Sequence, residues 1–264
     1  GVLGVSGSAL AAESKPNEAI AGEAKNVNAT YSDGKISGVY CGLKATGDSS
    51  ASKEAKISLT TANVEINATG VGIQGTNWGK VIVGNTDTQD ISITGTSQGV
   101  KLSKGSNAEI TGNQVKISNE SKRALIEIDN SIGGPKRPAQ LNIKGKQIEL
   151  KATGKIIEAK SKYKSAESFP KSSVILGDDS TELLDMKGSS GIKAGNNTEI
   201  IGTAKDIKLA VNSTASTTGV YAGTDEAKVS LTAKDKLLLD VTSGGGAKAV
   251  DANSNKIGER HLIT

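Results

Sequence analysis

The chain has 264 residues and a formal net charge of +4, with 32 glycines, four prolines and only 2% aromatic residues. Six aromatic side chains are too few to anchor the core of an ordinary globular domain of this length, and the abundance of Thr and β-branched residues argues against disorder. The 29 Lys outnumber the three Arg and are interspersed with 28 acidic residues, unlike the Arg-clustered, aromatic-rich surfaces that bind nucleic acid.

The first 36 residues differ from the rest and form a predicted N-terminal segment (1–36). Small apolar residues open it, and Ala9-Leu10-Ala11 has the form that a signal peptidase reads, which is typical of the end of an export signal. Alternatively, Val2 to Ala12 begin the fold as a capping strand or helix. Residues 13–36 are irregular and polar and predict a cap.

From residue 37 onward one short pattern recurs about every 30 residues, which is the signature of a repeat architecture. Its first run is centred on Val39, Val71, Val100, Ile126, Ile157, Ile192, Val220 and Val250.

Two further apolar-polar alternating runs follow each first run, and the period of two predicts strands with one buried and one wet face. The second runs are 55–60, 80–84, 108–112, 140–145, 173–177, 199–202 and 228–233. The third runs are 64–68, 90–95, 115–119, 147–152, 182–186, 206–211 and 237–241.

Three strands in about 30 residues fit neither a leucine-rich repeat nor a propeller blade, and no helical period is present. The sequence therefore predicts an all-β, single-chain parallel β-helix (β-solenoid) of seven to eight turns over residues 37–264. Each strand would pair with its counterpart one turn away, with aliphatic side chains stacked inside. The chain ends inside an eighth turn, which favours a fragment of a longer protein.

The longer connections, 42–54, 76–78, 129–139 and 160–171, all fall between a first and a second run and should lie along one edge of the coil. Aromatic and basic side chains on loops over a rigid scaffold are typical of a recognition surface. The alternative is that this corner merely tolerates insertions. The candidate ligand-binding residues on this edge are Trp78, Lys136, Arg137, Lys160, Lys162, Tyr163, Lys164, Phe169 and Lys171.

Signals for catalysis are weak. His261 is the only histidine and lies in the C-terminal tail, and Cys41 reads as a small buried side chain. The acidic group of Asp178 and Asp179, with Asp185 nearby, is the best candidate, but Asp is common in such turns. We therefore expect no enzyme, no cofactor and no metal site. A polysaccharide lyase or hydrolase on the same scaffold is the alternative.

These imperfect turns rich in Ser, Thr, Asn and Gly, with a single cysteine and a candidate export signal, resemble the passenger regions of bacterial autotransporters and two-partner-secretion exoproteins. The resemblance covers roughly residues 37–264 and rests on periodicity and composition. It implies a right-handed coil on the bacterial cell surface or secreted from it.

The same resemblance implies a role in attachment, autoaggregation or biofilm formation. The partner would be a protein or glycan receptor on a host or bacterial surface, or a second copy of the chain. The translocator barrel of such proteins is not present here, so any membrane contact would run through a barrel outside this chain. A spacer without binding activity is a further alternative.

Overall fold

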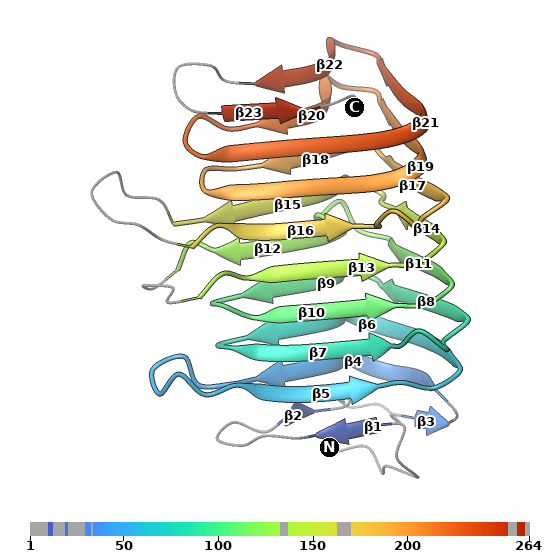
Figure 1. Cartoon of the computed structure of the whole chain (residues 1–264), viewed down its shortest axis with the longest axis vertical. Coiled ribbons are helices and arrows are strands. Elements are labelled where there is room, and N and C mark those ends of the chain that lie inside the picture. Colours follow the sequence, from blue (N-terminus) through green and yellow to red (C-terminus); the bar gives the residue numbers. More distant parts are fainter. Residues whose placement is uncertain are drawn as a thin grey trace.

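The computed structural model describes residues 10–12, 19–20, 30–32, 34–132, 137–162, 170–252 and 258–261. They form a parallel β-solenoid of about seven turns, and no helix is present in this part of the chain. Front strands run left to right and back strands right to left as the chain climbs from N to C, so the coil is right-handed (Figure 1). The fold class predicted from the repeat is confirmed.

The coil has three faces, which follow one another along each turn. The first face contains the second halves of β4 (Lys35–Thr46) and β6 (Asn63–Thr76), together with β9 (Gln98–Ser103), β12 (Ile126–Asn130), β15 (Lys155–Ser161), β18 (Ser190–Ala194), β20 (Thr217–Ala222) and β22 (Ala247–Ala252).

The second face contains β5 (Ala55–Leu59), β7 (Gly79–Gly84), β10 (Asn107–Thr111), β13 (Gln140–Lys144), β16 (Ser172–Leu176), β23 (Gly258–His261) and the first halves of β19 (Thr198–Ser213) and β21 (Ala227–Ser243). The third face contains the first halves of β4 and β6, the second halves of β19 and β21, and β8 (Asp90–Gly95), β11 (Gln114–Asn119), β14 (Gln147–Lys151) and β17 (Leu183–Gly188).

Pairing between turns is parallel throughout the coil. On the second face, Ile57 pairs with Val81, and the same column continues upward to Arg260 in steps that average 29 residues. The predicted second and third runs therefore coincide with strands. β6, β19 and β21 run on through a corner, where the sequence predicted separate short strands. β4 also runs through a corner, and it includes residues 35–36, predicted as part of an irregular cap, and residues 42–46, predicted as part of a long connection.

The first-face register differs from the prediction in the two lowest turns. Ile73, not Val71, pairs with Val100, and Leu43, not Val39, stands below Ile73. From Val100 upward the column is as predicted, through Ile126, Ile157, Ile192, Val220 and Val250. The pairing of β4 with β6 shifts register twice near Val39, so matching the short Gly-Val motifs gave the wrong alignment there.

The core consists of aliphatic side chains piled in register. In the first-face column, Ile126, Ile157 and Ile192 are each at most 1% exposed, and the columns of the other faces are also buried up to the uppermost turns, where Leu237 and Leu239 are only partly buried. Because each layer contacts the next along the axis, burial accumulates turn by turn without large aromatic side chains.

The three short N-terminal strands pair in the opposite sense. β1 (Leu10–Ala12) lies antiparallel to β5, and β2 (Ala19–Ile20) and β3 (Thr30–Ser32) lie antiparallel to β4. They occupy the lower edge of the coil, where the first turn would otherwise present open strand edges (Figure 1).

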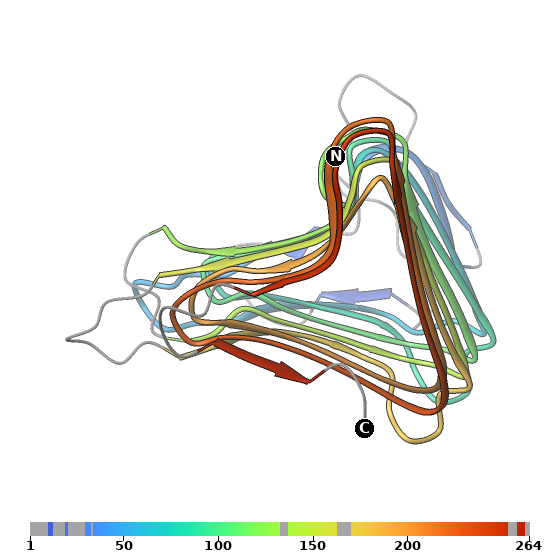
Figure 2. The same ribbon diagram turned by 90° about the horizontal axis from the view of Figure 1, so that it is seen from above.

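Seen along its axis, the coil is a bent triangle (Figure 2). The third face is straight, whereas the first face bends inward and leaves a concave outer surface. Glycines allow this bend in the lower turns, since a Cβ on Gly72 would lie 2.5 Å from Ile93 Cγ2 and 2.7 Å from the carbonyl oxygen of Gly99.

Candidate functional site

The connections from the first to the second face gather at one corner of the triangle, as the sequence predicted (Figure 2). Their backbones are held by buried asparagines. Asn130 Oδ1 accepts the amide N–H of Gly105 at 2.7 Å, and its Nδ2 donates to the carbonyl of Arg137. Without these contacts, the buried amide groups of the loops would lack hydrogen-bond partners.

Trp78 and Arg137 come together at this corner. The guanidinium of Arg137 lies 4.4 Å from the ring centroid of Trp78, a cation–π contact. Arg137 also donates from Nη1 to Glu54 at 2.8 Å and from Nε to the carbonyl of Gly105 at 2.5 Å. One side chain thus links loops of four successive turns.

The backbone at Trp78 is unusual, because its φ is +69° in a bulky residue. This conformation lays the indole against Gly105, where a Cβ would lie 3.0 Å from the ring. The Trp78–Arg137 pair is therefore built into the corner, and its contacts are largely internal to the protein.

The other described residues of the predicted set make contacts that do not involve the Trp78–Arg137 pair. Lys160 Nζ lies 3.6 Å from Glu158 on the first face, and Lys171 Nζ lies 4.0 Å from Glu226. The amide N–H of Lys162 donates a hydrogen bond to the carbonyl of Asn130, and its carbonyl accepts one from the side chain of Asn197. Four residues of the predicted set lie outside the described residues: Lys136, Tyr163, Lys164 and Phe169.

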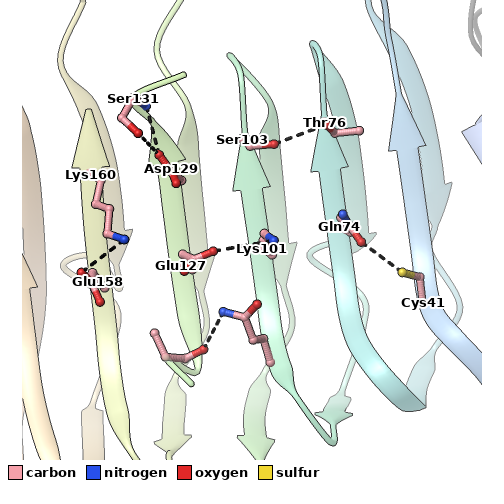
Figure 3. Close-up of polar contacts among 12 residues, drawn as sticks. Cys41, Gln74, Thr76, Lys101, Ser103, Glu127, Asp129, Ser131, Glu158 and Lys160 are labelled. Atoms are coloured by element: carbon pink, nitrogen blue, oxygen red, sulfur yellow. Dashed lines mark hydrogen bonds and ion pairs between the residues drawn. The ribbon is translucent and has the colours of Figure 1, made fainter. Parts of the chain in front are cut away.

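A column of charged side chains crosses the outer surface of the first face (Figure 3). Lys101, Glu127, Glu158 and Lys193 occupy equivalent positions in successive turns. Lys101 pairs with Glu127 at 3.9 Å, and Glu158 pairs with Lys155 at 2.7 Å. Two adjacent carboxylates are thus neutralised by lysines.

Glu158 is largely enclosed, with 18% of its side chain exposed. Burial raises its pKa, but the hydrogen bond from Lys155 and the positive charges around it outweigh that effect. The pKa of Glu158 therefore lies below its ordinary value.

Cys41 lies lower on the same side, 1% exposed, with its Sγ 3.1 Å from Gln74 Oε1 (Figure 3). The expectation of a small buried side chain is confirmed.

Higher up, the concave surface deepens into a groove of about 540 Å³ that spans four turns. It is lined by Lys155, Ser190, Gly191, Ile192, Lys193, Ser216, Thr217, Thr218, Tyr221, Gly246, Ala247 and Lys248. Three lining residues are lysines and none is acidic. Lys193 Nζ lies 5.2 Å from the centroid of the Tyr221 ring.

Sequence reasoning missed this groove. The signal was present in the repeated GIKAG and GVYAG, whose middle residues Lys193 and Tyr221 face outward at the same position of neighbouring turns. The groove also depends on the inward bend of the first face, which is a property of the whole cross-section. No single sequence motif encodes that bend.

The three candidate acidic residues do not form a cluster. Asp178 accepts hydrogen bonds from the backbone and hydroxyl of Ser180, which lower its pKa below the ordinary value. Asp179 faces Lys234 at 3.8 Å, and Asp185 lies in β17 beside Glu149. Among the described residues, no group of three or more His, Cys, Asp or Glu side chains could hold a metal ion.

Within the same described ranges, no helix is long and apolar enough to cross a membrane. Comparisons of the chain with protein-family models, with curated proteins and with solved structures find no match.

Proposed function

We propose that this chain is the rigid stalk of an adhesin, displayed on or secreted from a bacterial cell, that mediates attachment, autoaggregation or biofilm formation. The observation that carries the proposal is the continuous stacked core, which makes the coil stiff along its length while leaving all three outer faces free to vary. Stiffness with a polar, mixed-charge exterior suits a protein that holds a binding surface away from a cell.

The sequence composition supports the same proposal. A chain with one buried cysteine can be exported across two membranes without forming premature disulfides. The partner would be a protein or glycan on a host or bacterial surface, or another copy of the stalk.

A surface-display experiment tests the proposal. Residues 1–264 are fused to the translocator of an unrelated autotransporter in a non-adherent bacterium, and attachment and sedimentation are measured. The control is the same fusion carrying a β-solenoid of similar length and unrelated sequence. We expect attachment or aggregation above that control. Folded, displayed chain that behaves like the control would contradict the proposal.

The predicted corner is tested in the same assay by Trp78→Ala together with Arg137→Ala. Reduced attachment with an intact coil would support a binding edge at this corner. Unchanged attachment would assign the Trp78–Arg137 pair to loop stabilisation alone.

A further inference from the structure

The groove on the concave first face has two chemically distinct walls. One wall is the column Lys155, Ser190, Thr218 and Lys248, with lysines at its ends and hydroxyls between them. The other wall carries Lys193 and Tyr221 in neighbouring turns. Between the walls the floor is made of small residues such as Gly191, so the bottom of the groove is flat.

Charge makes the groove a site for an anion. No acidic residue lines it. Lys193 stands above Glu158 and its charge acts on that carboxylate, but within the described residues Lys193 makes no ion pair of 4.0 Å or less, and its Nζ lies over the Tyr221 ring. Lys155 and Lys248 have carboxylate partners, at 2.7 Å and 3.5 Å, that lie outside the lining. A bound carboxylate at Lys193 would therefore give this cation the close ion pair that it lacks.

The shape favours a sugar chain over a peptide. The wall strands β15, β18 and β20 are each paired on both sides, so within the described residues only β22, at the top of the groove, could offer an edge to an extended peptide backbone. Hydroxyl side chains, a flat floor and one tyrosine ring suit the hydroxyls and the apolar ring face of a pyranose. Successive turns are about 4.8 Å apart, close to the length of one sugar unit in a linear chain.

We propose that this groove binds a linear glycan of acidic sugars along the axis of the coil. Carboxylates of the glycan pair with Lys193 and Lys248, and one sugar ring packs on Tyr221. The proposal rests on the proposed function, because it names the ligand class of the stalk.

Calorimetric titration of the full chain with oligogalacturonate at fixed ionic strength tests the proposal. Lys193→Gln removes the cation that lacks a close ion pair, and we expect binding about 10-fold weaker. Tyr221→Thr keeps a strand-forming residue and removes the ring, with a loss of about 3–10-fold. Lys208→Gln is the matched control, since it removes an exposed lysine from the third face and should leave affinity unchanged.

Two comparison ligands complete the test. A neutral oligosaccharide of equal length should bind far more weakly than oligogalacturonate, and poly-L-glutamate should also bind more weakly. Absence of oligogalacturonate binding would overturn the proposal. Equal loss in Lys208→Gln, or equal binding of poly-L-glutamate, would also overturn it, because either result indicates attraction by charge alone.

This titration separates the proposal from the proposed function. A chain that binds oligogalacturonate but does not promote attachment when displayed would refute the adhesin and leave the groove assignment standing. Attachment that persists in displayed Lys193→Gln, without glycan binding by the purified chain, would refute the groove and leave the adhesin standing.

Discussion

Buried amide side chains close the corners of the coil. Asn119, 6% exposed, donates from Nδ2 to the carbonyls of Ser97 and Arg123, and its Oδ1 accepts the amide N–H of Thr153. These partners belong to three successive turns. One asparagine thus satisfies backbone groups that no strand ladder reaches at the corner between the third and first faces.

Replacing Asn119 by alanine should lower the free energy of unfolding by about 2–4 kcal/mol, because buried amide and carbonyl groups lose their partners. Urea denaturation followed by circular dichroism measures the change. Asn67→Ala, at an exposed position, is the control and should change stability by less than about 0.5 kcal/mol. Equal effects of the two substitutions would contradict the assigned role.

Trp78 is the only tryptophan, so its fluorescence reports on the Arg137 contact. Arg137→Ala removes the guanidinium over the ring and exposes the indole, and we expect a red-shifted emission maximum with a stability loss of about 1–2 kcal/mol. Arg123→Ala removes an exposed arginine elsewhere and should leave the emission unchanged. An unshifted spectrum in Arg137→Ala would mean that the two side chains do not touch.

Glu158 makes the folding stability of the chain depend on pH. Its pKa is depressed in the folded chain, so the folded state binds fewer protons than the unfolded state at this group. Its stabilising contribution is therefore complete above the unfolded value of about 4.5 and is lost as pH falls through the lower folded value. Glu158→Gln should flatten the decline of stability below pH 4.5, as measured by urea denaturation at several pH values. A decline as steep as in the parent chain would refute the assignment.

At the scale of the strand, two-residue alternation specifies which side chains enter the core. This is why the second and third runs could be predicted closely: Ile57, Ala108 and Leu141 alternate with polar neighbours and are buried in one column, as expected. The two lowest first-face strands were misaligned because glycines and register shifts replace strict alternation around Val39 and Val71. Local pattern alone cannot locate a shift that pairing with the next turn creates.

The inward bend of the first face depends on small residues. Gly72→Ala would place a Cβ against Ile93 and the carbonyl of Gly99, both within 2.7 Å, and should cost about 1–3 kcal/mol. Gly246→Ala is the control, since its nearest neighbour atom would be 3.6 Å away. Thermal unfolding of both variants measures the difference. If Gly72→Ala unfolds at the same temperature as the parent chain, the first face has space for a Cβ at this position and the assigned role of Gly72 is wrong.

The candidate sites were less predictable than the fold. The sequence correctly predicted that the long connections lie at one corner, because connections at equivalent places in successive turns stack along the same edge of a coil. It could not show that Arg137 donates hydrogen bonds to Glu54 and Gly105. Glu54 is 83 residues away along the chain, and only the stacking of turns brings the two together.

At the scale of the whole molecule, cohesion comes from layers that each contact only their neighbours. The core of such a coil runs along its whole length, and the stability is close to a sum over turns and the interfaces between them. The groove and the charged column both arise from this repetition, because equivalent positions of successive turns lie side by side on the surface.

Distances along one column test the parallel coil most directly. Ser58, Asn142 and Ser230 occupy equivalent positions on the second face, with Asn142 three turns and Ser230 six turns above Ser58. In a chain carrying Cys41→Ser, pairs of spin labels at 58 and 142 and at 58 and 230 are compared by double electron–electron resonance. The coil predicts backbone separations of about 14 Å and about 29 Å, the second narrowly distributed and twice the first. Distances that do not grow in proportion to the number of turns would contradict the account.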